Sequence, residues 1–183
     1  MSTSLGLFLD RDGTLIVDRD YLRNCADVKL IRGTGEAIGI LRALHCHLFL
    51  FTNQSGVSRG LLTLEDVERC NGEMVRQIGF GQIFDHVCIA TEGPDDVPVY
   101  RKPSPRFIDE MVDKFGLNRK FCYMVGDKSS DLLAGMNAGI EPVFVHSGKP
   151  PTNEVDDLIH RKMSLEFDDL LAFAKYLRDL NLK

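Results

Sequence analysis

Five short apolar runs recur along the chain and alternate with segments whose apolar residues have helical spacing. The runs, each typical of a buried strand, are Gly6–Asp10, His47–Thr52, His86–Ala90, Phe121–Gly126 and Pro142–His146. The helical patterns between them cover residues 34–45, 63–79, 104–116 and 129–138. This alternation predicts an α/β fold, a Rossmann-like three-layer sandwich whose mainly parallel sheet is covered by helices on both faces and joined by right-handed crossovers.

The C-terminal region adds one more predicted element. Leu170, Leu171, Ala174, Leu177 and Leu180 lie at helical spacing. They predict a final amphipathic helix that packs on the core and begins at Asp168, whose side chain suits a helix N-cap. With 183 residues and no internal repeat, we expect one domain over 1–183, with a core at 5–150 and a C-terminal segment and helix at 155–183.

Composition and charge exclude several classes of partner. Acidic and basic residues are interleaved, with a net charge of −5, so no basic stripe indicates nucleic acid binding. No apolar stretch is long enough for a bilayer, and Met1–Ser4 runs into the first strand without a signal sequence. We therefore expect a cytoplasmic protein without a membrane partner, a monomer or weak homo-oligomer.

The five cysteines are odd in number and none is spaced as Cys-x-x-Cys. They are expected to be reduced, mostly buried thiols. The five histidines also lack metal-ligand spacing, which favours structural or solvated roles.

The first apolar run stops abruptly at two carboxylates, Asp10 and Asp12, followed by Gly13 and Thr14. Open α/β sheets bind ligands at the carboxyl ends of their strands, so this pair lies where phosphoryl chemistry takes place in such folds. Positions two apart in a strand point the same way, which allows both acids to address one reacting centre. Alone, the pair is more typical of a solvated acidic turn after a strand.

Three further polar clusters follow predicted strands. They are Thr52-Asn53-Gln54-Ser55-Gly56, Arg101-Lys102-Pro103, and Gly126-Asp127-Lys128-Ser129-Ser130-Asp131. One edge of the predicted sheet thereby brings together hydroxyl and amide donors, two cations and more carboxylates. Each cluster alone is also typical of a polar turn, a surface cation pair or a helix cap; together they favour a phosphoryl-transfer site.

In these four clusters the chain resembles the haloacid dehalogenase (HAD) superfamily of aspartate-nucleophile phosphatases. Arg59-Gly60 and Gly148-Lys149-Pro150 extend the resemblance to the branch that contains heptose bisphosphate and histidinol-phosphate phosphatases. Members of that branch commonly carry a zinc loop of cysteines and a histidine before the Arg-Lys-Pro motif, whereas residues 88–100 offer one cysteine and no histidine. We therefore expect no zinc.

The resemblance implies a role for each candidate residue. Asp10 would be the nucleophile and Asp12 the general acid and base, while Thr52 and Lys102 would stabilise the phosphoryl group. Mg²⁺ would be the cofactor, held by Asp10, Asp12 through its backbone carbonyl, and Asp127, with Asp131 orienting Lys102 or a metal-bound water. The implied substrate-binding residues are Asn53, Gln54, Ser55, Arg59, Arg101 and Lys128.

The spacing of the motifs leaves no room for a cap domain, so short loops must determine the substrate. The implied activity is that of a Mg²⁺-dependent phosphomonoesterase that forms an aspartyl phosphate, with D-glycero-D-manno-heptose 1,7-bisphosphate cleaved at its 7-phosphate as the leading substrate. The alternative substrate is histidinol phosphate or another small phosphometabolite. The non-enzymatic alternative is that the protein is a phosphate-binding regulatory module. The segment from Glu92 to Tyr100, which includes most of the acidic loop from Thr91 to Pro98, replaces the zinc loop, and its role is open.

Overall fold

The computed structural model describes residues 4–161 and 163–181. Six parallel strands form one sheet in the order β3-β2-β1-β4-β5-β6. The strands are β1 (Gly6–Leu9), β2 (His47–Asn53), β3 (His86–Ala90), β4 (Cys122–Gly126), β5 (Glu141–Val145) and β6 (Leu165–Phe167). The described residues leave out residues 1–3 of the predicted domain. They also leave out residues 162 and 182–183 of the predicted C-terminal segment.

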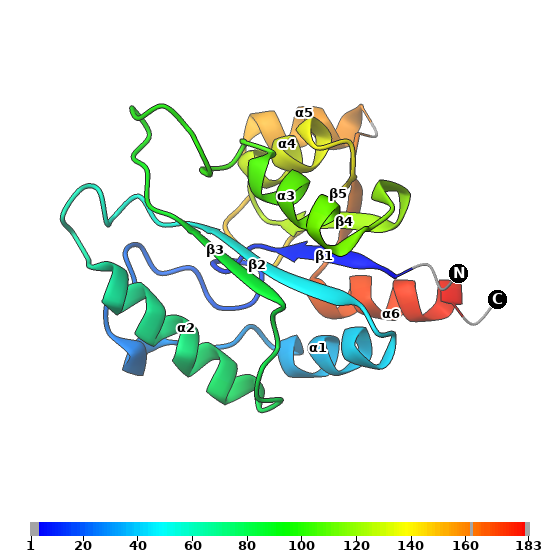
Figure 1. Cartoon of the computed structure of the whole chain (residues 1–183), viewed down its shortest axis with the longest axis horizontal. Coiled ribbons are helices and arrows are strands. Elements are labelled where there is room, and N and C mark those ends of the chain that lie inside the picture. The colour runs from blue at the N-terminus through cyan, green and yellow to red at the C-terminus, as the bar shows by residue number, and fades with distance from the viewer. Residues whose placement is uncertain (1–3, 162, 182–183) are drawn as a thin grey trace.

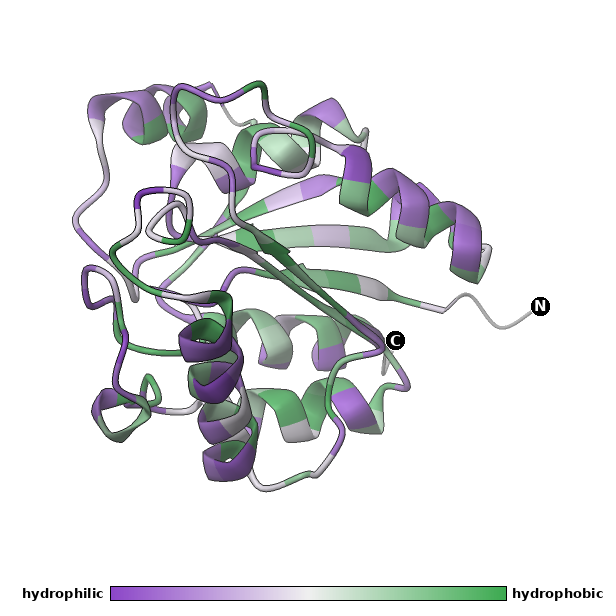
Figure 2. Ribbon diagram, turned by 60° about the vertical axis from the view of Figure 1, so that its left-hand side comes forward, coloured by the Kyte–Doolittle hydropathy of each residue, from purple (hydrophilic) through white to green (hydrophobic). Residues whose placement is uncertain are grey.

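Helices cover both faces of the sheet (Figure 1). They are α1 (Thr34–Ala43), α2 (Leu64–Ile78), α3 (Arg106–Phe115), α4 (Ser129–Asn137), α5 (Asn153–His160) and α6 (Leu170–Asn181), with short 3₁₀ helices η1 (Cys25–Asp27) and η2 (Arg119–Phe121). Apolar residues of α1, α2 and α6 pack on one face, and those of α3, α4 and α5 pack on the other. The hydrophobic side of each helix accordingly faces the sheet (Figure 2), which confirms the predicted α/β sandwich.

Several boundaries differ from the prediction. Strand β1 ends at Leu9, so Asp10 and Asp12 follow the strand instead of ending it. Neither α5 nor β6 was predicted, because eight and three residues are too short to give a clear periodic pattern. The expected start of the last helix at Asp168 is wrong: Asp169 caps it, accepting a hydrogen bond from the backbone N–H of Ala172 at 2.8 Å.

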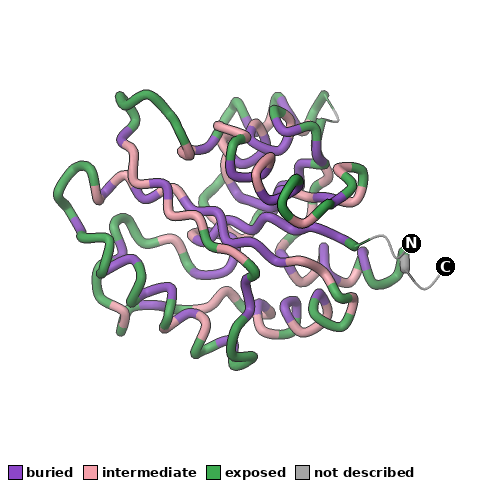
Figure 3. Tube along the Cα trace, in the orientation of Figure 1, coloured by how far each residue is buried: buried purple, intermediate pink, exposed green. Residues whose placement is uncertain are grey.

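The central strands β1, β2, β4 and β5 are mostly buried, whereas the edge strands β3 and β6 are partly exposed, and many connecting loops are exposed (Figure 3). Only a loop and η1 lie between β1 and α1, and only α2 lies between β2 and β3, which confirms the absence of a cap domain. No helix among the described residues is both long and apolar enough to span a bilayer. Cys70 and Cys122 are buried, but the other three thiols are only half-buried, so the expectation that most are buried is wrong.

Candidate functional site

Three neighbouring strands of the sheet deliver the polar residues of the site. Asp10 follows β1, Thr52 lies near the end of β2, and Asp127 follows β4. All three side chains are buried, with 4% or less of each residue exposed. The backbone N–H of Asp10 donates to the carbonyl of Val125 at 2.9 Å, which continues the β1–β4 pairing one residue past the strand. The predicted strand-end clusters therefore do meet at one edge of the sheet.

Lys102 connects these strand ends although it comes from the loop between β3 and α3. Its Nζ lies 2.6 Å from Asp10 Oδ1 and 2.6 Å from Asp131 Oδ1, and donates to the carbonyl of Phe51 at 2.8 Å. Burial opposes its charge, but the carboxylates of Asp10 and Asp131 raise the pKa of Lys102, so that the ammonium stays protonated. A buried cation thus offsets two of the buried carboxylates.

The polar turn after β2 holds the other groups in place. Asn53 pairs with the backbone of Lys102, accepting from its N–H at 2.9 Å and donating to its carbonyl at 3.1 Å. Gln54 donates from Nε2 to Asp12 Oδ2 at 3.0 Å and to the hydroxyl of Thr52 at 2.9 Å. Both amides therefore fix residues of the strand-end clusters, a function that their sequence position did not reveal.

Asp12 is held by a buried arginine. Arg11, 1% exposed, donates from Nε to Asp12 Oδ2 at 3.0 Å and from Nη2 to Oδ1 at 3.1 Å, and its Nη1 donates to Asn71 Oδ1 on α2 at 3.0 Å. Burial raises the pKa of Asp12 above its ordinary value, with Arg11 acting in the opposite direction and the Asp10 charge adding to the rise. A carboxyl with a raised pKa is suited to giving and taking protons.

Asp127 completes a cluster in which one oxygen each of Asp10, Asp127 and Asp131 lie within 4.8 Å of one another. Asp127 Oδ1 is buried and has no hydrogen-bond partner among the described residues. Burial raises the pKa of Asp127 to about 7, and the charges of Asp10 and Asp131 contribute to the rise. The nearest cation to this oxygen is Lys128 Nζ at 3.8 Å. Three crowded carboxylates, one of them with an oxygen that accepts no hydrogen bond, fit a hard divalent cation such as Mg²⁺.

Two glycines make room for this carboxylate. A Cβ at Gly13, whose φ is +89°, would lie 2.3 Å from Asp127 Oδ2, and one at Gly148 would lie 1.9 Å from the same atom. No side chain larger than hydrogen fits at either position, so the backbone closely surrounds Asp127.

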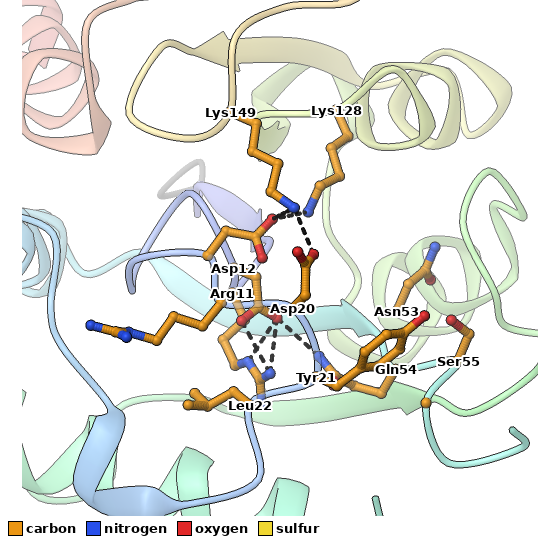
Figure 4. A pocket seen from close by; sticks show the side chains of 13 residues that line it. Arg11, Asp12, Asp20, Tyr21, Leu22, Asn53, Gln54, Ser55, Lys128 and Lys149 are labelled. Atoms are coloured by element: carbon orange, nitrogen blue, oxygen red, sulfur yellow. Dashed lines mark hydrogen bonds and ion pairs between the residues drawn. The ribbon is translucent and has the colours of Figure 1, made fainter. Parts of the chain in front are cut away.

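An outer cleft of about 210 Å³ opens beside the reacting centre. Figure 4 shows Lys128 and Lys149 reaching into it from one side and Tyr21 and Ser55 bordering it from another. Lys149 Nζ lies 2.7 Å from Asp20 Oδ1, and Lys128 Nζ lies 3.2 Å from Asp18 Oδ2. Burial opposes the charge of Lys128, but the nearby carboxylates, that of Asp10 foremost, raise its pKa.

Most of the predicted residues border one of the two connected cavities. The inner cavity is lined by Asp10, Asp12, Asn53, Ser55, Arg101, Lys102, Lys128, Ser130 and Asp131, and the outer cleft also has Gln54. Of the predicted residues, Thr52, Asp127 and Arg59 do not line them. Arg59 donates to the hydroxyl of Tyr21 and borders a separate cavity with Asp95 and Asp96. The side chains of Arg11, Asp18, Arg19, Asp20 and Lys149 also border the cleft and were not among the predicted site residues. Two features of the sequence could have identified two of these residues. Arg11 stands directly between Asp10 and Asp12, and Lys149 lies in a Gly-Lys-Pro turn after a predicted strand.

Comparison with known proteins agrees with this geometry. Residues 99–172 match the HAD-hydrolase-like family model. A Helicobacter pylori (strain 26695) protein named D-glycero-beta-D-manno-heptose-1,7-bisphosphate 7-phosphatase is 33% identical over 145 residues, covering 77% of this chain and 83% of the relative. A Haemophilus ducreyi protein of the same name is 31% identical over 180 residues, covering 93% of this chain and 97% of the relative.

A solved structure is similar along nearly the whole chain. The D,D-heptose 1,7-bisphosphate phosphatase from B. bronchiseptica, complexed with magnesium and phosphate, superposes with a TM-score of 0.84 at 26% identity and covers 98% of this chain and 99% of its own. Fold, site geometry and relatives agree: the chain belongs to the HAD superfamily of hydrolases and is a phosphoric monoester hydrolase.

Proposed function

We propose that this enzyme is a Mg²⁺-dependent phosphatase that works through an aspartyl phosphate on Asp10 and removes the 7-phosphate of D-glycero-D-manno-heptose 1,7-bisphosphate. The observation that carries the proposal is the convergence of Asp10, Asp12 and Lys102 on one cavity. A nucleophile, an acid that also acts as base, and a fixed cation are the groups that phosphoryl transfer through a carboxylate requires.

In the first step a carboxylate oxygen of Asp10 forms a bond to phosphorus while the bond from phosphorus to the leaving oxygen breaks. Asp12 gives its proton to that oxygen, and the sugar leaves as an alcohol. In the second step Asp12 takes a proton from water, whose oxygen attacks phosphorus, and the bond to Asp10 breaks. The raised pKa of Asp12 suits both transfers.

Lys102 and Thr52 would hold the equatorial phosphoryl oxygens. Lys102 directs its ammonium at Asp10, Asp131 and the Phe51 carbonyl, so a phosphoryl oxygen must replace one of these three partners. Asp131 also accepts from the backbone N–H of Lys128 through Oδ2 at 3.0 Å. We assign Asp131 to orienting Lys102, because Asp131 Oδ1 lies only 2.6 Å from Lys102 Nζ.

The magnesium ligands would be Asp10, Asp127 and the backbone carbonyl of Asp12. The Oδ1 of Asp127, which accepts no hydrogen bond, and the raised pKa of Asp127 support this assignment. Bound magnesium would offset the charge of the carboxylates and of the phosphate, so that an anionic nucleophile can approach an anionic substrate.

The sugar and its second phosphate would occupy the outer cleft. Arg19, Lys128 and Lys149 border it, and Arg101 borders the inner cavity next to it. Such cations suit a bisphosphate better than histidinol phosphate, which carries an ammonium group and has no second phosphate. The relatives in H. pylori and H. ducreyi are named for the bisphosphate, which supports the same choice. Ser55 borders both cavities, and Asn53 and Gln54 would contact substrate in addition to fixing Lys102 and Asp12.

The test is a phosphate-release assay with Mg²⁺ on the heptose bisphosphate, histidinol phosphate and p-nitrophenyl phosphate, with ³¹P NMR to identify the phosphate removed. We expect preference for the bisphosphate and loss of the 7-phosphate. The matched control is Asp10→Asn, which should abolish turnover while circular dichroism shows an intact fold.

Preference for histidinol phosphate would overturn the substrate and leave the mechanism standing. Turnover that survives in Asp10→Asn would overturn the covalent route.

A further inference from the structure

The loop between β3 and α3, residues 91–105, carries Arg101 and Lys102 to the site yet contains no helix or strand. It is the long excursion beyond β3 in Figure 1, and its outer part is exposed in Figure 3. Val97 at its tip is 83% exposed. Apolar burial therefore does not fix the outer part of this loop, whose conformation depends on polar contacts, whereas Tyr100 near its end packs against the core.

One carboxylate oxygen accepts hydrogen bonds from several residues in the second half of the loop. Glu92 Oε1 accepts hydrogen bonds from three consecutive backbone N–H groups, those of Val99 at 3.2 Å, Tyr100 at 2.7 Å and Arg101 at 3.3 Å. In the reverse direction, Arg101 Nη1 donates to the backbone carbonyl of Glu92 at 3.2 Å. Arg101 is thus tied to Glu92 by both its main chain and its side chain.

Converging N–H groups form a concave site for an anion, and here the anion is part of the chain. Partial burial of Glu92 acts against its charge, but the N–H groups of Tyr100, Arg101 and Val99 lower the pKa of the carboxyl. Glu92 stands two residues after the last residue of β3. It therefore links the rigid end of the sheet directly to Arg101.

Lys102, by contrast, is fixed independently of Glu92. Its backbone pairs with Asn53 and its ammonium with Asp10 and Asp131. Loosening Glu92 should consequently displace Arg101 and leave Lys102 in place.

We propose that Glu92 is a positioning residue that determines substrate affinity by holding Arg101 in the site. This inference rests on the proposed function in one respect, namely that Arg101 contacts the substrate beyond the transferred phosphoryl group. Glu92 itself does not touch the reacting atoms.

The experiment is a double-mutant cycle of Glu92→Gln and Arg101→Met, with Asp96→Asn as matched control. Asp96 lies in the same loop and accepts from the N–H of Gly93 at 2.6 Å; it lines neither the inner cavity nor the outer cleft. We expect Glu92→Gln to raise KM for the heptose bisphosphate about tenfold with kcat within about twofold, and Asp96→Asn to change neither. In the Arg101→Met background, Glu92→Gln should cause no further rise in KM, because its effect passes through Arg101.

The proposal would be overturned if the rise in KM of the double variant equalled the product of the rises in the two single variants. It would also be overturned if Glu92→Gln had a lower melting temperature but an unchanged KM. An unchanged KM in Arg101→Met alone would overturn the substrate contact of Arg101, and with it this inference.

Hydrogen exchange of the unmodified enzyme gives a test that does not depend on the folding of a variant. The amide protons of Tyr100 and Arg101 should exchange at least about tenfold more slowly than that of Val97 in the same loop. Equal exchange rates would overturn the Glu92 contact.

Discussion

Arg11 orients the carboxylate of Asp12, although Arg11 was not itself a predicted site residue. The sequence predicts that Asp10 and Asp12 act together, and both line the inner cavity. The predicted reason, alternation along a strand, is wrong, because β1 ends at Leu9. What orients Asp12 is Arg11, whose second partner, Asn71, lies sixty residues away along the chain. No local pattern reveals a contact of that separation.

Asp12→Asn should show separately how the first step depends on proton donation by Asp12 and how the second step depends on proton removal by Asp12. Without an acid, kcat for a sugar phosphate should fall about 10²–10⁴-fold, because an alkoxide leaves poorly without a proton. With p-nitrophenyl phosphate the first step needs little acid, but the base for the second step is lost. Rapid mixing should then show a burst of nitrophenol close to the enzyme concentration. Equal losses on both substrates with no burst would contradict the acid and base role of Asp12.

At the scale of elements, long periodic patterns were predictable and short ones were not. Helix α2 is amphipathic over 15 residues and begins with a reciprocal pair, in which Thr63 accepts from the N–H of Asp66 and Asp66 from that of Thr63. In contrast, β6 has three residues and forms only by pairing with β5. Its strand conformation is set by that tertiary contact and not by its own sequence.

Helix α2 also supports the site, since its Asn71 accepts from the buried Arg11 guanidinium. Asn71→Ala would leave Nη1 of Arg11 without this acceptor in a buried position. We expect a loss of about 1–3 kcal/mol in the free energy of unfolding, measured with urea. The control on the same helix is Glu68→Ala, at an exposed position, which should change stability by less than about 0.5 kcal/mol. Similar losses in both variants would argue against a specific Arg11–Asn71 contribution.

For the whole molecule, the crowded carboxylates predict a pH dependence of stability. The pKa of Asp127 is raised from 3.8 to about 7 in the folded protein without metal. The folded state therefore binds more protons than the unfolded state between these values, so the free energy of unfolding should fall as pH rises from about 4 to about 7. The full shift corresponds to at most about 4 kcal/mol.

Urea unfolding in EDTA and in excess Mg²⁺ across this pH range measures the effect. Magnesium should flatten the dependence, because a bound cation favours the ionised carboxylates. Asp127→Asn should flatten it without metal. A slope that persists unchanged in Asp127→Asn would assign the pH dependence to another group.

The position of β1 in the sheet has a consequence for how the chain is made. Gly6 pairs with His47 on one side and with Cys122 on the other, so β1 can complete its pairing only after β4 has been synthesised. Until β4 leaves the ribosome, β1 has one open apolar edge, which is the kind of surface that aggregates or recruits chaperones. The same delay applies to the chemistry, because Asp127 and Asp131 follow β4. A nascent chain shorter than this point has Asp10, the proposed nucleophile, but lacks the other two carboxylates of the cluster. We therefore expect activity only after β4 has paired with β1.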